Sequence, residues 1–323
     1  MNKRIFIGVD GGGTCTRAIA ITADGKVLGK VIGENINFYA SGMDVAKANF
    51  KSTLKSLMEK CGISDYECIS IGMSAVDDDP SDDIVNLFCQ DMLPVNKVFM
   101  RSDAYMALMG MTLGGPGIIV VSGTGSVGLA VDKYGKSHYI GGWGYLLEDE
   151  GSAYYIAIEG IKAALKSFDG LGPTTKLEDE LLAYFKISDH RKLIKLLYDP
   201  PIEKSFIAGF ARVVSQCAEQ GDTSSLLILH STTNILVDYA LRLIGIIGDN
   251  SCSVAIYGGV FQNNEKLVRD FKKRVNSVFP NVKIGFPPFP AEIGAAFAAM
   301  RKNEIEITPD MFSNLKRFLE SKK

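Results

Sequence analysis

Residues 5–32 read IFIGVDGGGTCTRAIAITADGKVLGKVI. Apolar runs at 5–9, 18–22 and 27–32 alternate with two turns, a glycine-rich one and one at Asp24-Gly25. Short β-branched runs separated by such turns predict strands joined as hairpins. The chain therefore opens with a predicted three-stranded meander.

Helices and strands alternate after this meander. Apolar residues at helical spacing over 44–61 predict a helix, and a strand is predicted at 68–72. A helix opened by Ser81, a strand at 98–100 and a helix opened by Asp103 follow. This order predicts a mixed sheet with crossover helices, an α/β fold.

The opening pattern returns at residues 118–140. Predicted strands at 118–121, 127–131 and 137–140 again enclose a glycine-rich turn, and Ser122 takes the place of Asp10. We interpret this match as an internal repeat of one hairpin module. It predicts two lobes, residues 1–115 and 116–323, the second with a helical insertion at about 152–248. Helices are expected there at 154–168, 177–185, 193–197, 206–218 and 226–247, the last capped by Asp222.

Composition narrows the class of partner. The chain has 323 residues, 46% of them hydrophobic, which is enough apolar surface for two cores. Lys and Arg number 35 against 37 Asp and Glu, so no positive field would gather nucleic acid or anionic membrane. We expect a small-molecule partner.

Neither export nor metal binding through Cys and His is indicated. The first apolar run stops at Asp10, which is too short for a signal peptide, and no later run is long enough to cross a bilayer. The six cysteines form no C-x-x-C pair, and the three histidines have no metal-like spacing. We expect free thiols and a cytoplasmic location.

The first glycine-rich turn predicts a phosphate site. Three consecutive glycines, Gly11, Gly12 and Gly13, exceed what a hairpin needs, and their N–H groups can converge on phosphate oxygens, with the Thr14 hydroxyl as a further donor. Asp10, at the strand end, is placed to hold magnesium or its water shell. The alternative is a plain turn, as at Asp24-Gly25.

The second turn has the same character. Gly123, Thr124 and Gly125, followed by Ser126, fall at the matching place in the second lobe, so two nests are predicted to hold one triphosphate. Residues 123–128 also fit the dinucleotide pattern G-x-G-x-x-G. That pattern needs a helix at its glycines, whereas residues 129–131 continue as strand.

Asp103 follows a strand and opens a helix, where open α/β sheets place ligands. A carboxylate there is suited to accept the proton of a hydroxyl during phosphoryl transfer. A helix N-cap is the alternative, and the local sequence favours neither role over the other.

A third cluster combines an aromatic ring with acids. The only Trp stands in Gly141-Gly-Trp-Gly144, ahead of Glu148, Asp149 and Glu150. Trp faces pack on sugar rings, and carboxylates bind the hydroxyls. The acids also suit the start of the helix that follows. Asn37 is a further sugar contact, or a residue serving a turn.

Together these motifs resemble the N-acetylglucosamine kinase branch of the BadF/BadG/BcrA/BcrD ATPase family, in the superfamily of sugar kinases, acetate kinase and actin. Residues 10–14 are similar to the first phosphate motif, 122–126 to the second and 256–260 to the adenosine motif, and residues 290–296 resemble the closing helix of the core. The resemblance covers nearly the whole chain. It implies a duplicated actin-like ATPase (ribonuclease H-like) fold with a central cleft.

By the same resemblance Asp103 is the catalytic residue, and ATP and magnesium are the cofactors. The expected ATP- and phosphate-binding residues are Asp10, Gly11, Gly12, Gly13, Thr14, Gly123, Thr124, Gly125, Ala218, Gly258, Gly259 and Asn263. The expected substrate-binding residues are Asn37, Asp103, Ser126, Gly142, Trp143, Gly144, Tyr145 and Asp149.

The expected reaction is phosphorylation of a sugar hydroxyl, first the 6-hydroxyl of N-acetylglucosamine, with N-acetylmuramate, glucosamine or glucose as alternatives. An activator ATPase of a dehydratase is a second hypothesis, but such activators hold an iron–sulfur cluster with cysteines in a glycine-rich interface motif, which this sequence lacks. A sugar-sensing repressor is the third hypothesis, and it would need a helix-turn-helix before the first strand, where four residues stand ahead of Ile5.

The sequence does not decide whether the protein forms a homodimer.

Two departures from relatives bear on the sugar. Relatives usually carry Gly where this chain has Glu148, whose side chain either reshapes the pocket or points away from it. Acids stand at 77–79, where relatives often show small residues near the acetamido group.

Overall fold

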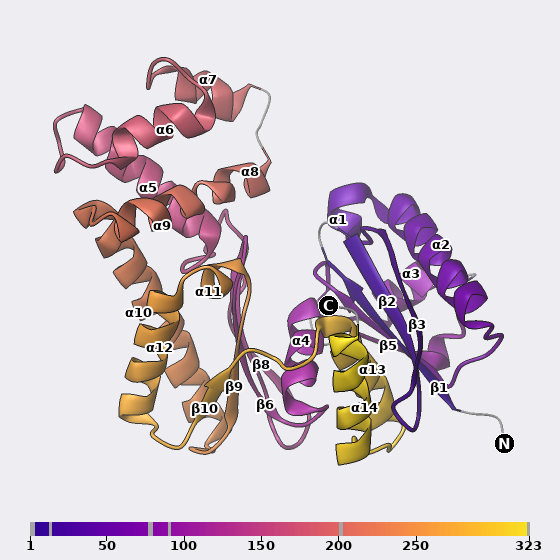
Figure 1. Ribbon diagram of the computed structural model, residues 1–323. Coiled ribbons are helices and arrows are strands. Elements are labelled where there is room, and N and C mark those ends of the chain that lie inside the picture. The colour runs from indigo at the N-terminus through magenta and orange to yellow at the C-terminus, as the bar shows by residue number, and fades with distance from the viewer. Residues whose placement is uncertain (1–3, 13–14, 77–79, 90–91, 200–202, 322–323) are drawn as a thin grey trace. The chain divides into compact units, whose positions relative to one another are not determined.

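The computed structural model describes residues 4–12, 15–76, 80–89, 92–199 and 203–321 (Figure 1). The chain forms two compact units. The first comprises residues 1–117, 133–137 and 286–323, and the second comprises residues 118–132 and 138–285. Each unit carries its own five-stranded sheet.

The first unit's sheet has the strand order β3-β2-β1-β4-β5. Its strands are β1 (Ile5–Gly11), β2 (Cys15–Thr22), β3 (Val27–Glu34), β4 (Cys68–Met73) and β5 (Val98–Arg101). β1, β2 and β3 pair antiparallel as the predicted meander, whereas β1, β4 and β5 run parallel. Asp10 pairs with Gly72, and Gly72 with Arg101, so the carboxyl ends of these three strands share one edge of the sheet.

The sheet is buried on both faces. In β2, Ala18 and Ala20 pack in the core that contains Phe50 of α2, whereas Ile19 and Ile21 face the core formed with α13 and α14. Side chains of a strand alternate between faces, so an uninterrupted apolar strand requires cover on both sides. The helices are α1 (Phe38–Ser41), α2 (Met43–Cys61), α3 (Asp82–Cys89), α4 (Asp103–Thr112), α13 (Ala291–Lys302) and α14 (Pro309–Glu320), with a 3₁₀ turn at Val95–Lys97.

Helix α13 lies against β1 at backbone distance. A Cβ on Gly8 would lie 2.1 Å from the Glu292 carbonyl oxygen, and one on Gly294 would lie 1.9 Å from the Met106 carbonyl oxygen of α4. Only glycine permits so close an approach. It brings the first turns of α4 and α13 to the edge where β1 ends.

The second unit repeats this topology. Its sheet order is β10-β9-β6-β7-β8, and read from β8 it matches the first sheet strand for strand. β6 pairs parallel with β9, and β9 with β10, as β1 does with β4 and β4 with β5. This confirms the duplicated α/β module. The strands are β6 (Gly117–Ser122), β7 (Ser126–Val131), β8 (Ser137–Gly141), β9 (Ser253–Tyr257) and β10 (Lys283–Gly285).

The predicted helical insertion lies between β8 and β9. Asp222 caps the longest helix by accepting a hydrogen bond from the Ser225 N–H, as expected. The helix predicted at 206–218 is instead two, α8 and α9, which meet at Phe210. The helices are α5 (Ala153–Phe168), α6 (Leu177–Phe185), α7 (Lys192–Tyr198), α8 (Lys204–Gly209), α9 (Ala211–Glu219) and α10 (Thr223–Ile247).

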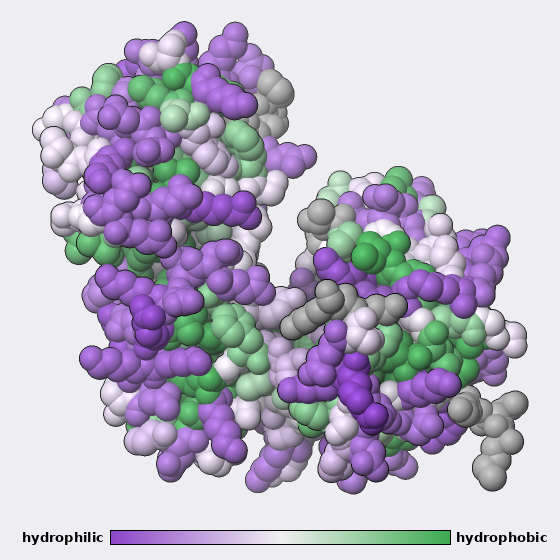
Figure 2. Space-filling view, viewed as in Figure 1, coloured by the Kyte–Doolittle hydropathy of each residue, from purple (hydrophilic) through white to green (hydrophobic). Residues whose placement is uncertain are grey.

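Two further helices, α11 (Gly259–Gln262) and α12 (Glu265–Val278), follow β9. Leu267, Phe271 and Val275 turn one face of α12 into the core, and its outward face is polar in Figure 2. This is the amphipathic pattern of a surface helix.

The end of the chain differs from the expected lobe boundaries. Residues 286–323 were expected in the second lobe, but they belong to the first unit, where Phe297 and Met311 pack with Phe6. Sequence order alone does not tell which of two similar sheets a buried helix will cover. Within the described residues, no helix combines the length and the apolar character needed to cross a membrane.

Candidate functional site

Asp10, the last residue but one of β1, lies in an environment that disfavours its charge. Its side chain accepts a hydrogen bond from Arg17 at 3.5 Å, and the residue is only 8% exposed. Burial, and then the charges of Glu292 and Asp103, raise the pKa of the Asp10 carboxyl to about 6, and Arg17 offsets them in part. Three carboxyl groups therefore gather at this edge of the sheet.

Glu292 is the most buried of the three. It lies in the first turn of α13, is 1% exposed and forms an ion pair with Lys30 of β3. Lys30 thus balances Glu292, while Asp10 has Arg17 at a longer distance. The expected sites include neither Glu292 nor Lys30, although Glu292 stands in the quoted motif 290–296.

Asp103 is the first residue of α4, but it is not the cap. Ser102 is the N-cap and accepts a hydrogen bond from the Tyr105 N–H at 3.0 Å. The Asp103 carboxylate accepts one from the adjacent Ala104 N–H at 2.8 Å. The N-cap alternative for Asp103 is therefore wrong, and the proton-acceptor role stays a prediction.

Asn37 caps a helix. Its side-chain oxygen accepts from the N–H groups of Tyr39 and Ala40, and its amide nitrogen donates to the Ser74 hydroxyl at 3.0 Å. This is the local role considered as the alternative, and a sugar contact remains a prediction for the rest of its amide.

The first glycine turn is described only in part. Gly11 packs against Ile36, whereas a Cβ on Gly12 would meet, among the described residues, only the Cys15 carbonyl oxygen, at 3.5 Å. Gly13 and Thr14 lie outside the described residues, as do the acids at 77–79.

In the second unit, four of the predicted nucleotide residues surround one cavity of about 530 Å³. They are Gly123, Thr124, Gly259 and Asn263. Ala218 is buried within α9, and Gly258 packs on the Ser122 backbone; neither is in the wall of this cavity. Helices α8 and α9 supply wall residues that the sequence did not suggest, namely Ser205, Ala208, Gly209, Ala211, Arg212, Ser215, Gln216 and Glu219.

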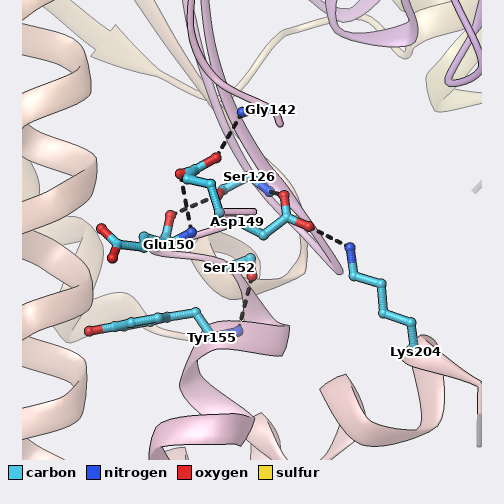
Figure 3. Close-up of polar contacts among 8 residues, drawn as sticks. Ser126, Gly142, Asp149, Glu150, Ser152, Tyr155 and Lys204 are labelled. Atoms are coloured by element: carbon cyan, nitrogen blue, oxygen red, sulfur yellow. Dashed lines mark hydrogen bonds and ion pairs between the residues drawn. The ribbon is translucent and has the colours of Figure 1, made fainter. Parts of the chain in front are cut away.

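Asp149 is held from two sides (Figure 3). Its Oδ1 accepts a hydrogen bond from the Ser126 N–H at 3.1 Å, and its Oδ2 accepts one from Lys204 Nζ at 2.5 Å. Asp149 is buried and has a φ of 75°. A Cβ on Gly125 would lie 2.9 Å from Asp149 Oδ1, so the missing side chain makes room for this carboxylate.

Glu148 does not point away from the loop. Its carboxylate accepts hydrogen bonds from the Gly142 N–H at 3.0 Å, from the Glu150 N–H at 3.2 Å and from the Tyr239 hydroxyl. Burial, and then the bond to Glu148, raise the pKa of the Tyr239 hydroxyl well above its usual range. Glu148 thus ties the glycine loop to α10.

The helix that follows is capped by Ser152, which accepts a hydrogen bond from the Tyr155 N–H at 3.1 Å. Asp149 and Glu150 precede this cap. Trp143 is 73% exposed, and Gly144 follows it in the loop. Tyr145 packs edge-on against Tyr154, 5.3 Å between ring centroids.

Comparison with known proteins places these features in a family. The model of the BadF/BadG/BcrA/BcrD ATPase family matches residues 7–300. The chain is 35% identical over 285 residues, 87% of its length and 93% of the relative's, to the N-acetylmuramic acid/N-acetylglucosamine kinase of Clostridium acetobutylicum. It is 30% identical over 319 residues, 94% of its length and all of the relative's, to the N-acetyl-D-glucosamine kinase of Dictyostelium discoideum.

The fold has solved counterparts. A structure from Chromobacterium violaceum aligns with a TM-score of 0.73 at 23% identity, covering 92% of this chain and 99% of that one. This agrees with the actin-like fold expected from the motifs.

Proposed function

Because the chain belongs to the BadF/BadG/BcrA/BcrD ATPase family, we propose that it is an ATP-dependent sugar kinase acting on the 6-hydroxyl of N-acetylglucosamine. The observation that carries the proposal is the carboxylate group at the end of β1, where Asp103 stands near Asp10 and does not serve as a helix cap. The names of the two relatives described above support the sugar class.

Asp103 is the proposed proton acceptor. The sugar 6-oxygen bonds to the γ-phosphorus of ATP, the bond from that phosphorus to the β–γ bridging oxygen breaks, and the hydroxyl proton passes to the Asp103 carboxylate. ADP and the sugar 6-phosphate are the products. Catalysis here consists mainly of positioning and charge stabilisation, since phosphoryl transfer requires little covalent chemistry from the protein.

The residues around Asp10 fit magnesium. A buried carboxylate whose pKa is raised to about 6 by neighbouring acids would be relieved by a divalent cation, and oxygen donors are those magnesium prefers. Magnesium bound there would neutralise charge on the phosphates. Asp10 would hold it through water, because the described residues offer no group of three acids, His or Cys placed around one ion.

The second unit is proposed to contribute contacts to both ligands. The nucleotide would occupy the cavity between α8, α9 and α11, with Asn263 and Gly259 in its wall. The sugar would lie against Trp143, with its hydroxyls donating to Asp149. N-acetylmuramate, glucosamine and glucose remain alternative substrates.

We also propose a cellular location for the protein, and we keep one prediction about its oligomeric state. All six cysteines are free, which suits a reducing, cytoplasmic compartment. Homodimer formation stays a prediction that light scattering of the purified chain tests.

The decisive experiment measures ADP release with magnesium-ATP and each of the four sugars. We expect turnover to depend on the sugar, to be fastest with N-acetylglucosamine, and to yield its 6-phosphate by NMR. Rapid ATP hydrolysis without sugar, unchanged when any sugar is added, would contradict the proposal and favour the activator ATPase.

A further inference from the structure

Lys204 connects the helical insertion to the acidic turn. It is the first residue of α8, and its Nζ lies 2.5 Å from Asp149 Oδ2, although 55 residues separate the two in the chain. The Lys204 side chain is 27% exposed and that of Asp149 is 5% exposed. The ion pair is therefore largely shielded from water, and removing one partner would leave a buried charge.

The lysine is fixed by more than its carboxylate partner. Its Nζ lies 5.1 Å from the ring centroid of Tyr145 and 5.7 Å from that of Tyr154. A cation within about 6 Å of an aromatic ring face is attracted to it. Tyr145 belongs to the loop proposed to bind the sugar, so loop, turn and insertion meet at this ammonium group (Figure 3 shows its bond to Asp149).

The arrangement leaves Asp149 partly free to bind a ligand. One oxygen accepts from the Ser126 N–H and the other from Lys204. An ionised carboxylate offers about four lone-pair positions, so acceptor capacity remains for hydroxyl donors. Lys204 and Ser126 together determine the direction in which those positions point.

The same helix also reaches the nucleotide cavity. Ser205, Ala208 and Gly209, all in α8, lie in its wall together with Gly123 and Thr124 of the second glycine turn. One short helix thus contacts both the proposed sugar carboxylate and the proposed nucleotide site within a single compact unit.

We propose that Lys204 is a positioning residue for the sugar: it holds Asp149 in the orientation that accepts the sugar hydroxyls, and through α8 it links that carboxylate to nucleotide binding. The inference rests on the proposed function, because it assigns Asp149 to the sugar. In this proposal Lys204 acts through Asp149 and contacts neither the sugar 6-hydroxyl nor the γ-phosphate.

The test compares Lys204→Met with Lys204→Arg and with the matched control Lys162→Met, which removes an exposed lysine paired with Glu159 in α5 of the same insertion. We expect Lys204→Met to raise the KM for N-acetylglucosamine by about 10- to 100-fold, as for the loss of a partly buried charged partner. Lys204→Arg should recover most of this loss, and Lys162→Met should change nothing.

A double-mutant cycle with Asp149→Asn separates positioning from a general structural role. If Lys204 acts through Asp149, Lys204→Met should add little to the KM effect of Asp149→Asn. Calorimetry with the non-hydrolysable analogue AMPPNP should show tighter sugar binding with nucleotide than without it in the wild type, and this difference should shrink in Lys204→Met. Additive KM effects, or sugar affinity indifferent to AMPPNP in the wild type, would overturn the inference.

Two outcomes keep this inference distinct from the proposed function. A wild type that phosphorylates none of the four sugars defeats the proposed function. A wild type that phosphorylates one of them, with Lys204→Met at normal KM, defeats the role of Lys204 alone. Should Lys204→Met fail to fold, Lys204→Gln, which keeps a donor but no charge, provides the same comparison.

Discussion

The two glycine-rich turns occupy equivalent places in two sheets of the same strand order, yet the charges around them differ. In the first unit Asp10 stands next to the end of β1, and the negative charges of Glu292 and Asp103 disfavour its ionised form. In the second the matching residue is Ser122, whose hydroxyl donates to the Gly151 carbonyl at 2.6 Å. The nearby carboxylate there, Asp149, is already paired with Lys204.

This difference shows how a duplicated module can divide its work. Both turns follow the strand that stands third in its sheet order. The first unit concentrates negative charge, which suits a metal ion and a proton acceptor, and the second balances its charge and offers hydrogen-bonding groups, which suits neutral hydroxyls.

The largest expected effect belongs to the acidic side. Asp103→Asn should lower kcat by about 10²- to 10⁴-fold, because it removes the proton acceptor while keeping the shape of the side chain. The KM for ATP should hardly change. Since Ser102 is the N-cap, the melting temperature should also hardly change. Near-normal turnover by Asp103→Asn would show that Asp103 is not the proton acceptor, and Asp149 would then be the next candidate.

A control variant measures the contribution of the Ser102 N-cap to stability separately from the role of Asp103. Ser102→Ala should lower stability by about 0.5–2 kcal/mol through loss of the bond to the Tyr105 N–H. A comparable loss of stability in Asp103→Asn would mean that the carboxylate supports the helix after all.

The second prediction concerns the charge at Asp10. Its folded-state pKa is raised from 3.8 to about 6, so the stabilisation from the protonated form is present below pH 3.8 and lost as the pH rises through 6. Asp10→Asn should therefore raise the free energy of unfolding by about 1–3 kcal/mol at pH 8, and by much less at pH 4. The same substitution should weaken magnesium binding in the presence of nucleotide by about 10- to 100-fold.

Denaturant unfolding at the two pH values checks the first part, and calorimetric magnesium titration with AMPPNP present checks the second. An unaltered stability at pH 8 would show that Asp10 is not destabilised by its neighbours. Unaltered magnesium affinity in Asp10→Asn would show that Asp10 does not help to hold the metal ion.

The smallest expected effect compares the glycines themselves. Gly125→Ala should raise the KM for sugar about 10-fold, because the new Cβ, 2.9 Å from Asp149 Oδ1, displaces that carboxylate. Gly12→Ala should leave the KM for sugar unchanged, since among the described residues its Cβ would make one ordinary contact, at 3.5 Å to the Cys15 carbonyl oxygen. Equal effects of the two variants on sugar kinetics would show that the turns do not differ as described.

The sequence supplied the elements and the repeat, because apolar periodicity and turn residues are local signals. The glycine-rich turn predicted Gly123 and Thr124, and the family resemblance implied Gly259 and Asn263; all four line one cavity. The sequence did not indicate Lys204, since nothing near residue 204 shows that its partner stands 55 residues earlier. Such pairings depend on how helices of the insertion pack.

Local sequence signals also failed to predict two other features of the structure, the sheet that α13 covers and the residue that caps α4. The Ala-rich helix α13 is buried almost throughout, so its sequence is equally suited to either sheet. Two close approaches place it in the first unit, that of Gly8 in β1 to α13 and that of Gly294 in α13 to Met106 of α4. At 102–103, two adjacent residues are both good caps, and the one whose backbone is extended, Ser102, takes that role.

The exposure of Trp143 has a spectroscopic consequence. It is the only tryptophan in the chain, it is 73% exposed, and it stands in the loop that Glu148 ties to α10. Its fluorescence therefore reports one point of the molecule and is already close to that of a ring in water. Global unfolding should shift this emission little and is better followed by circular dichroism. A sugar that covers the indole should move the emission to shorter wavelength and provide a binding signal free of background from other tryptophans.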